Sequence, residues 1–242
     1  MVCSAPTLPL MSSPAPLRTG GNIVQLRQLL AEQFPGLRQT LSARKRAERL
    51  ATGLPALDAL LEGGLPRGAF TELIARGHGS GSAEVLHELL RRVAAQRQFL
   101  ALVDGRSSFD VDAVEPAVLS RLLWVRCEQA TEALKATDLL LRDRNFPFVA
   151  LDLKLNPVGE LRKITASIWF RYARLLEQNQ TTVLVITPLA LVSVAEYRLC
   201  VASGFGANVF SQSRADLLSR LRFTLLRAAV EGGIEDVSAQ AG

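Results

Sequence analysis

The sequence predicts an α/β fold in which a mainly parallel sheet is flanked by helices. Strand-length apolar runs alternate with segments that have helical periodicity, and this alternation is typical of a parallel sheet with helical crossovers. The run "FLALVD" (Phe99–Asp104) is almost continuously apolar, as a buried parallel strand requires. In "TELIARGHGSGSAEVLHELL" (Thr71–Leu90), a strand, a glycine-rich loop and a helix follow one another.

The predicted elements follow from periodicity and from turn residues. We expect strands at Phe70–Ile74, Phe99–Asp104, Arg121–Cys127, Phe146–Leu153 and Thr181–Thr187. We expect helices at Ala56–Leu61, Ser82–Arg97 and Glu128–Asp143, a short one in "DVDAVEPAVL", and a long one that starts at Asn156-Pro157, with Leu161, Ile164, Ile168, Tyr172 and Leu175 on its core face. After Pro188, the sequence favours a helix and then a strand near Leu221–Arg227 over one long helix.

Four regions are predicted along the chain. Residues 1–21 are rich in proline, serine and glycine, which favours a flexible tail, and residues 231–242 form a loose C-terminal tail. Residues 22–50 hold a helix and a basic linker, and residues 51–230 form the core. Asn22 can cap that helix. Its apolar face would bind a partner or pack on its own domain, and it comprises Ile23, Leu26, Leu30 and Phe34.

Composition limits the functional class. With 48% apolar and 21% charged residues, the chain is predicted to be globular, and it has no apolar run of membrane-spanning length. The cysteines Cys3, Cys127 and Cys200 form no C-x-x-C pair, which favours a reducing, cytoplasmic location without a zinc site. Because the only histidines are His78 and His87, we expect no metal site and no histidine-based metal catalysis.

A local basic cluster accounts for much of the net charge of +5. It lies in "RQTLSARKRAER" and comprises Arg38, Arg44, Lys45, Arg46 and Arg49, opposed by Glu48. Such a cluster can contact the phosphates of DNA or an acidic partner, and it can equally be a solvated linker. It contains no aromatic side chain on which a base could stack, so direct DNA contact stays open.

The glycine-rich loop departs from a working phosphate loop. That motif needs a lysine after its last glycine and then a serine or threonine that holds Mg²⁺. Here Gly81 is followed by Ser82 and Ala83, and Glu84 would repel a triphosphate. Arg76 and His78 are the nearest substitute cations. A degenerate nucleotide site would comprise Gly77, Gly79, Ser80, Gly81, Ser82 and Asp152.

The segment "TGLPALDALLEGGLPRGAFTELI" resembles the entry to the RecA-type recombinase core. The matching residues are Thr52, Gly53, Leu57, Asp58, Gly63, Gly64, Leu65, Pro66 and Gly68. The similarity runs from about Ile23 to Val230 and is best to the ImuA family of RecA-like accessory proteins. It implies a RecA-like core of the P-loop NTPase type, related also to the division inhibitor SulA.

The resemblance also defines what the site lacks. RecA recombinases place a catalytic glutamate two residues beyond the aspartate that ends a core strand. Here Asp104 is followed by Gly105 and Arg106, and an arginine cannot accept a proton. Asp152 follows "FVAL", where the resemblance implies a Walker B aspartate, or it simply caps the next turn. We therefore expect no catalytic residue and no hydrolysis, while binding of ATP and Mg²⁺ stays open.

The resemblance implies an adaptor in SOS-type DNA damage tolerance. Its expected partners are a catalytically inactive Y-family polymerase relative and an error-prone polymerase of one mutagenesis cassette, with RecA as a further candidate. DNA contact is left open, and no membrane partner is expected. Two alternatives remain: a divergent RecA-type ATPase of repair or recombination, and a SulA-like inhibitor of cell division.

Overall fold

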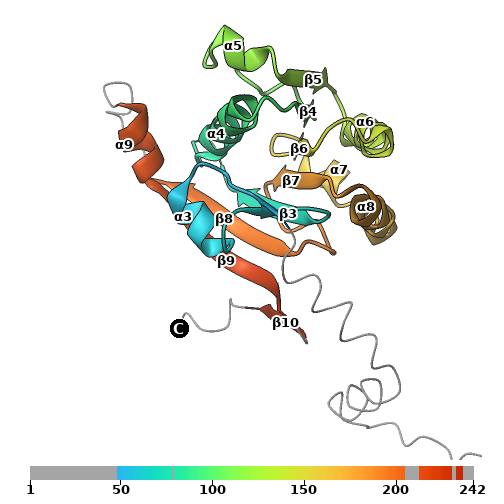
Figure 1. Ribbon diagram of the computed structural model, residues 1–242. Coiled ribbons are helices and arrows are strands. Elements are labelled where there is room, and N and C mark those ends of the chain that lie inside the picture. Colours follow the sequence, from blue (N-terminus) through green and yellow to red (C-terminus); the bar gives the residue numbers. More distant parts are fainter. Residues whose placement is uncertain (1–47, 78, 205–212, 231–232, 237–242) are drawn as a thin grey trace, which may run out of the picture. The chain divides into compact units, whose positions relative to one another are not determined.

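The described part of the chain contains one eight-stranded sheet with helices on both faces (Figure 1). This computed structural model describes residues 48–77, 79–204, 213–230 and 233–236. The strand order is β10-β9-β8-β3-β7-β6-β4-β5. Strands β3 to β8 run parallel, and β9 and β10 pair antiparallel at one edge. The predicted α/β class with a mainly parallel sheet is therefore confirmed.

The strands of the large sheet fall close to their predicted positions. They are β3 (Phe70–Ala75), β4 (Leu100–Asp104), β5 (Leu122–Arg126), β6 (Phe148–Asp152), β7 (Thr182–Thr187), β8 (Tyr197–Ser203), β9 (Leu221–Val230) and β10 (Gly233–Asp236). The strand predicted near Leu221 is confirmed as β9, preceded by a helix. Strand β8 was not predicted, and β10 lies inside the segment expected to be a loose tail.

The helices connect successive strands. They are α3 (Pro55–Leu60), α4 (Ser82–Ala95), α5 (Pro116–Leu119), α6 (Ala130–Asp143), α7 (Val158–Leu161), α8 (Ala166–Asn179) and α9 (Arg214–Ser219). In Figure 1, α4 lies on one side of the sheet, and α6 and α8 lie on the other. Each of these three is amphipathic, so its apolar side closes one half of the core.

Two apolar clusters fill the spaces between sheet and helices. One contains Leu86, Leu89 and Leu90 of α4, against Leu102 of β4. The other contains Trp169 and Tyr172 of α8 with strand residues from the opposite sheet face. Side chains of the central strands are buried on both faces, which explains why these strands have continuous apolar sequences.

The long helix expected from Asn156-Pro157 is wrong. Pro157 precedes a short α7, the chain leaves helical geometry after Leu161, and Thr165 in extended conformation precedes α8. The side chains that α8 buries are Trp169, Tyr172 and Leu176, whereas Ile168 and Leu175 are half-buried. The predicted core face is nevertheless present across the break, because Leu161 and Tyr172 lie in the core cluster and Ile164, Ile168 and Leu175 pack against it.

The residues before β3 on which the resemblance depends, 52–68, form a segment with internal hydrogen bonds, which we call the entry segment. The carboxylate of Asp58 accepts bonds from the backbone N–H of Thr52, at 2.8 Å, and from its hydroxyl, at 2.7 Å. Gly64 has a φ of 131° and lies beside β1 (Arg49–Leu50), which pairs with β2 (Leu65–Pro66). A Cβ on Gly64 would lie 2.2 Å from the carbonyl oxygen of Leu50, so only glycine fits.

Most of the predicted N-terminal features lie outside the described residues. These are the helix with Ile23, Leu26, Leu30 and Phe34, and the basic residues Arg38, Arg44, Lys45 and Arg46. The chain divides into two compact units, Met1–Arg46 and Ala47–Gly242, and the sheet belongs to the second. Among the described residues, no helix has the length and hydrophobicity needed to span a membrane.

Arg49 is the described member of the basic cluster, and its guanidinium is engaged in the core unit. It donates to the hydroxyl of Tyr197, at 3.1 Å, and lies 3.5 Å from the carboxylate of Glu62. It also lies over the Tyr197 ring. The charge of Arg49, expected to contact DNA or a partner, is therefore already used to hold β1 against the sheet.

Candidate phosphate-loop site

The glycine-rich loop joins β3 to α4 at the carboxyl edge of the parallel strands. Gly77, Gly79 and Gly81 all have positive φ, at 72°, 69° and 90°, and Gly81 immediately precedes α4. The predicted strand, loop and helix are present. The site residues Ser80, Gly81 and Ser82 are buried, whereas Gly77 and Gly79 are exposed.

A lysine from another strand reaches the position where the loop lacks its own. Lys154, two residues beyond the end of β6, places its Nζ 3.1 Å from the Oγ of Ser82. Ser82 is 1% exposed, and its hydroxyl is the acceptor in this bond. The sequence indicated only Arg76 and His78 as substitute cations. Arg76 is exposed, and His78 lies outside the described residues.

Asp104 and Asp152 end neighbouring parallel strands and lie at the same level of the sheet. The Oδ1 of Asp152 accepts the backbone N–H of Lys154 at 2.9 Å, so this aspartate caps the turn after β6, and a role in a nucleotide site stays a prediction. Burial raises the pKa of the Asp152 carboxyl, and the charge of Lys154 acts in the opposite direction. Lys154 therefore connects the strand-end aspartate to the first residue of α4.

Asp104 holds the loop that follows β4. Its carboxylate accepts the backbone N–H groups of Arg106, at 3.2 Å, and Phe109, at 2.9 Å. It also accepts from the indole Nε1 of Trp124, at 3.2 Å, and from the hydroxyl of Ser108, at 3.3 Å. With these four donors, the buried carboxylate is fully satisfied by the protein.

The position where the resemblance implies a catalytic glutamate holds Arg106. Its guanidinium is exposed and donates to the carbonyl oxygen of Glu128, at 3.0 Å. Gly105 before it is buried, and a Cβ there would lie 2.2 Å from the Oδ1 of Asn156. The loop is thus packed closely at Gly105, and Arg106 contacts the segment that leads into α6.

Residues from the C-terminal third of the chain pack against the loop and α4. The hydroxyl of Ser203, at the end of β8, donates to the carbonyl oxygen of Gly79. A Cβ on Gly81 would lie 2.3 Å from the side chain of Leu221, which starts β9. These contacts come from the strands on the side of β3 that faces away from β6 and Lys154.

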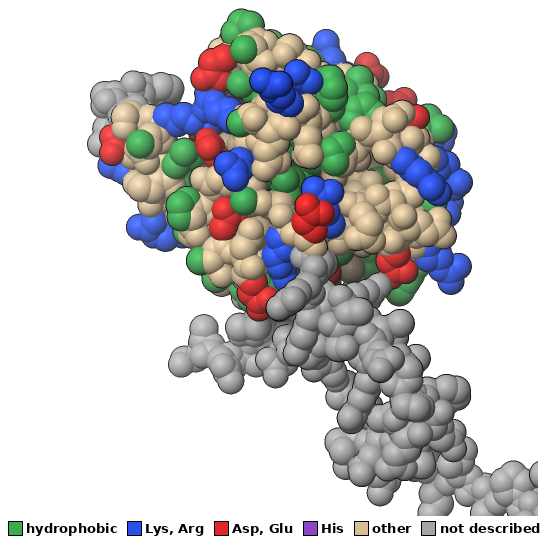
Figure 2. All heavy atoms as spheres, in the orientation of Figure 1, with side chains coloured by type: hydrophobic (Ala, Val, Ile, Leu, Met, Phe, Trp, Pro, Cys, Tyr) green, Lys and Arg blue, Asp and Glu red, His purple; other side chains and the backbone are tan. Residues whose placement is uncertain are grey.

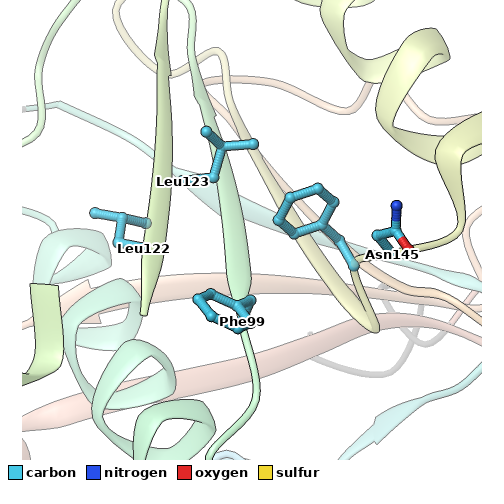
Figure 3. Close-up of a pocket in the computed structure, with 5 residues that line it drawn as sticks. Phe99, Leu122, Leu123 and Asn145 are labelled. Atoms are coloured by element: carbon cyan, nitrogen blue, oxygen red, sulfur yellow. The ribbon is translucent and has the colours of Figure 1, made fainter. Parts of the chain in front are cut away.

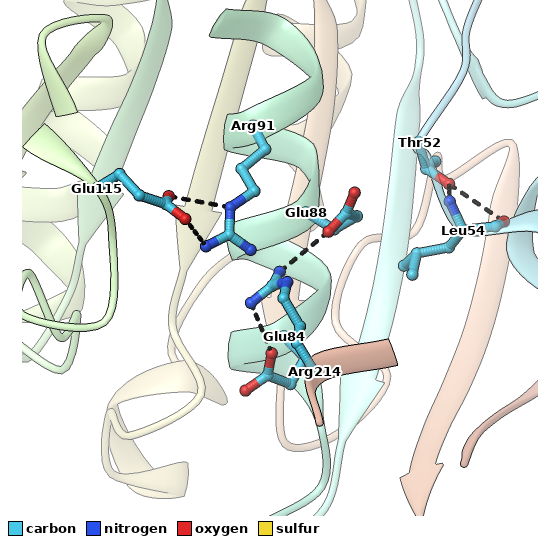
Figure 4. Close-up of polar contacts among 7 residues, drawn as sticks. All are labelled: Thr52, Leu54, Glu84, Glu88, Arg91, Glu115 and Arg214. Carbon is cyan, nitrogen blue, oxygen red and sulfur yellow. Dashed lines mark hydrogen bonds and ion pairs between the residues drawn. The ribbon is translucent and has the colours of Figure 1, made fainter. Parts of the chain in front are cut away.

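Arg214, the first residue of α9, joins that helix to α4. Its guanidinium nitrogens lie 3.3 Å from the carboxylate of Glu84 and 3.0 Å from that of Glu88 (Figure 4). On the same helix, Arg91 binds Glu115 with two bonds, at 2.6 and 3.1 Å. The acidic charge of Glu84, which would repel a triphosphate, is thereby paired with an arginine of the chain.

The sequence did not predict a buried ion pair in the middle of the sheet. Glu72 in β3 is fully buried, and its carboxylate lies 2.5 Å from the Nε of Arg198 in the neighbouring β8. The other carboxylate oxygen accepts the backbone N–H groups of Leu191 and Val192, at 2.6 and 3.0 Å. The only sequence signal was an acidic residue at a core position of β3. Its function is structural, since the four polar groups satisfy one another.

The remaining ionisable groups offer little catalytic chemistry. His87 is buried in α4 against the ring of Phe109, and desolvation by burial lowers its pKa. Burial raises the pKa of the Cys127 thiol, because it disfavours the charged thiolate, and so it favours the less reactive thiol. Within the described ranges, no group of three or more His, Cys, Asp or Glu side chains could hold a metal ion.

A scan against models of known protein families finds no match, and a search of curated proteins finds none either. The geometry of the site is therefore the basis for its interpretation. The fold brings together Ser80, Ser82 and Asp152 with Lys154, and it leaves Gly77, Gly79 and Arg76 at the surface.

Proposed function

We propose that this protein is a non-hydrolysing, RecA-like accessory protein that acts in SOS-type DNA damage tolerance by binding other proteins. The parallel sheet with a glycine-rich loop between β3 and α4 is compatible with a RecA-like core of the P-loop type. The retained entry segment, with its Thr52–Asp58 bonds, accounts physically for the motif on which the resemblance depends.

One observation carries the non-hydrolysing part of the proposal: the phosphate loop is engaged by the chain's own side chains. Lys154 binds Ser82, Ser203 binds the backbone at Gly79, and Leu221 packs on Gly81. A working loop must instead direct its N–H groups and lysine at phosphate oxygens. The position that corresponds to the missing glutamate holds Arg106, which cannot accept a proton.

The pathway and the partners come from the resemblance alone. We propose as partners the Y-family polymerase relative and the error-prone polymerase of the mutagenesis cassette. The unit Met1–Arg46, with its predicted apolar helix face, is proposed as one contact region. Residues 47–242 form a separate compact unit, so removal of the N-terminal segment is expected to leave the sheet folded.

ATP hydrolysis by the purified full chain tests the catalytic part. We expect no magnesium-dependent turnover above background in the wild type, in Asp152→Ala or in the matched exposed variant Asp143→Ala. Isothermal titration with ATP and Mg²⁺ measures binding separately from turnover. Turnover that Asp152→Ala abolishes and Asp143→Ala preserves would overturn the proposal in favour of the divergent ATPase.

Binding to the purified polymerase relative tests the adaptor part. We expect the full chain to bind and a chain lacking residues 1–36 to bind more weakly while retaining its circular dichroism and melting transition. Equal binding by both chains would remove the N-terminal segment from the interface. Failure of the full chain to bind either cassette polymerase would contradict the adaptor proposal.

A further inference from the structure

Strand β5 is one of the two edges of the described sheet, and β10 is the other. Strand β5 pairs with β4 on one side, and no described strand pairs with its other side. Its sequence, LLWVR, contains no proline or glycine, and its register with β4 is regular. A regular edge strand exposes a row of backbone N–H and C=O groups that another strand can pair with.

An apolar hollow lies beside the start of this strand. It has a volume of about 380 Å³ and is lined by Phe99, Leu122, Leu123, Asn145 and Phe146 (Figure 3). Phe99 is 45% exposed and Leu123 is 39% exposed. Leu122 and Leu123 bring one wall of this hollow to the edge strand, where a strand-adding partner uses pockets for its alternate side chains.

Arginines surround the edge without acidic partners among the described residues. Arg121 lies over the ring of Phe99, at 5.0 Å, and Arg126 lies over that of Trp124, also at 5.0 Å. Arg97 and Arg144 are exposed. In the sequence, Arg97 lies two residues before Phe99, and Arg144 immediately precedes Asn145. In Figure 2, basic and apolar side chains lie near the top of the view, with some acidic side chains beside them, where Figure 1 places α5 and β5.

We propose that the β5 edge and this hollow bind an extended, acidic segment of a partner protein, which adds to the sheet as a strand. The added backbone would pair with β5, an apolar side chain would enter the hollow, and flanking carboxylates would meet Arg121 and Arg126. This inference rests on the proposed adaptor function and specifies the chemistry of one partner segment.

Charge argues against the two other occupants. In an isologous dimer, antiparallel pairing of two β5 strands would bring Arg121 of one copy toward Arg126 of the other. The chain's own residues 1–47 carry six basic residues against the single acid Glu32, so this segment would meet like charge: Arg18, Arg27, Arg38, Arg44, Lys45 and Arg46. An acidic segment from another protein is the occupant that complements the edge.

Synthetic peptides test the proposal on the full chain by fluorescence anisotropy. The probe alternates glutamate with valine and phenylalanine. A second peptide has lysine in place of glutamate, and a third carries N-methyl groups on alternate backbone amides. We expect the glutamate peptide to bind and the other two to bind at least about tenfold more weakly, because they lack the charge and the ladder bonds respectively.

Variants of the chain locate the binding surface. Arg121→Glu and Leu123→Ser are each expected to weaken binding of the glutamate peptide by about tenfold. The matched variants Arg92→Glu, at an exposed arginine of α4, and Phe170→Ser, at an exposed side chain of α8, are expected to leave it unchanged. Melting curves establish that each variant is folded, and the N-methylated peptide tests the edge with the wild-type chain alone.

Besides failure of the peptides to bind, three results would overturn the proposal. They are binding of the lysine peptide as tight as that of the glutamate peptide, binding unaffected by N-methylation, and self-association of the chain in sedimentation that Leu123→Ser abolishes. If the peptides fail to bind and the chain also hydrolyses no ATP, the β5 surface is refuted and the adaptor proposal stands on another surface. Turnover of ATP would instead refute the proposed function itself.

Discussion

The ammonium of Lys154 donates a hydrogen bond to the hydroxyl of Ser82 across two elements of the fold, at 3.1 Å. The two residues are far apart in the sequence, yet both follow the carboxyl ends of strands in the same parallel sheet. Beside them, Asp152 is buried and accepts the backbone N–H of Lys154. The stability of this group of three residues should therefore depend on pH.

Lys154→Met should extend the pH range over which stability falls as pH rises. Burial raises the pKa of Asp152 above its ordinary 3.8, and Lys154 lowers it. Between the unfolded and folded pKa values, the folded chain holds the proton that the unfolded chain has released, so stability decreases with rising pH. Without Lys154, the folded pKa is higher and this window is wider.

Urea denaturation from about pH 4 to 8 measures the effect. The exposed Lys163→Met is the matched control and should follow the wild type. The double variant Asp152→Asn/Lys154→Met should lose the added pH dependence, since the titrating group is gone. A Lys154→Met curve parallel to that of the wild type over the whole range would show that the ammonium does not act on Asp152.

Removal of one partner of the Glu72–Arg198 pair should be strongly destabilising. Glu72→Gln leaves a guanidinium that is 17% exposed without its carboxylate, and loss of one partner of a buried pair costs about 3–5 kcal/mol. Arg142→Gln breaks a more exposed pair with Asp138 and should cost far less, because solvent screens exposed ion pairs. Equal costs in urea denaturation would contradict the structural function assigned to Glu72.

Gly64→Ala should destabilise the entry segment. Its φ of 131° is unfavourable for alanine, and the added Cβ would collide with the backbone of Leu50. We expect a loss of at least about 2 kcal/mol, from strain and displacement of β1. A Cβ on Gly159 in α7 would have no heavy atom within 4 Å, so Gly159→Ala should be neutral or slightly stabilising. Thermal melting of both variants decides the comparison.

Single-stranded DNA binding, if carried by the basic segment, should depend on salt through Arg44, Lys45 and Arg46. Replacing all three with glutamine should weaken binding and reduce the slope of log K against log salt by about 0.7 for each phosphate that the chain no longer neutralises. Arg49→Gln is the informative control: its guanidinium already binds Tyr197 and Glu62 and should not change the slope. An affinity that added salt leaves unchanged would exclude this mode of DNA contact.

The sheet was largely predictable because its central strands are buried on both faces. Continuous apolar runs such as those in Leu100–Asp104 and Phe148–Asp152 are typical of buried parallel strands. Strand β8 was missed because its burial alternates but its residue types do not: the less buried positions hold Arg198, Cys200 and Ala202. The helix break before α8 was missed because no proline or glycine marks residues 162–165.

Candidate loop residues could be found from glycine spacing, but their neighbours could not. Nothing in the sequence near Ser82 indicates Lys154, because that side chain reaches α4 only through the order of β3, β7 and β6 in the sheet. The same reason applies to Leu221 on Gly81 and to Arg214 on Glu84. Contacts between distant segments depend on strand order, which local periodicity does not encode.

By itself, the sequence determined most strands of the sheet, where the backbone must turn at glycine, and which residues of a working phosphate loop are absent. The tertiary structure alone decided what fills the space around that loop, which arginine of the basic cluster is already committed, and which strands lie at the edges of the described sheet. The physical reason is range: propensity and periodicity act over a few residues, whereas charge pairing and burial depend on groups that only the folded sheet brings together.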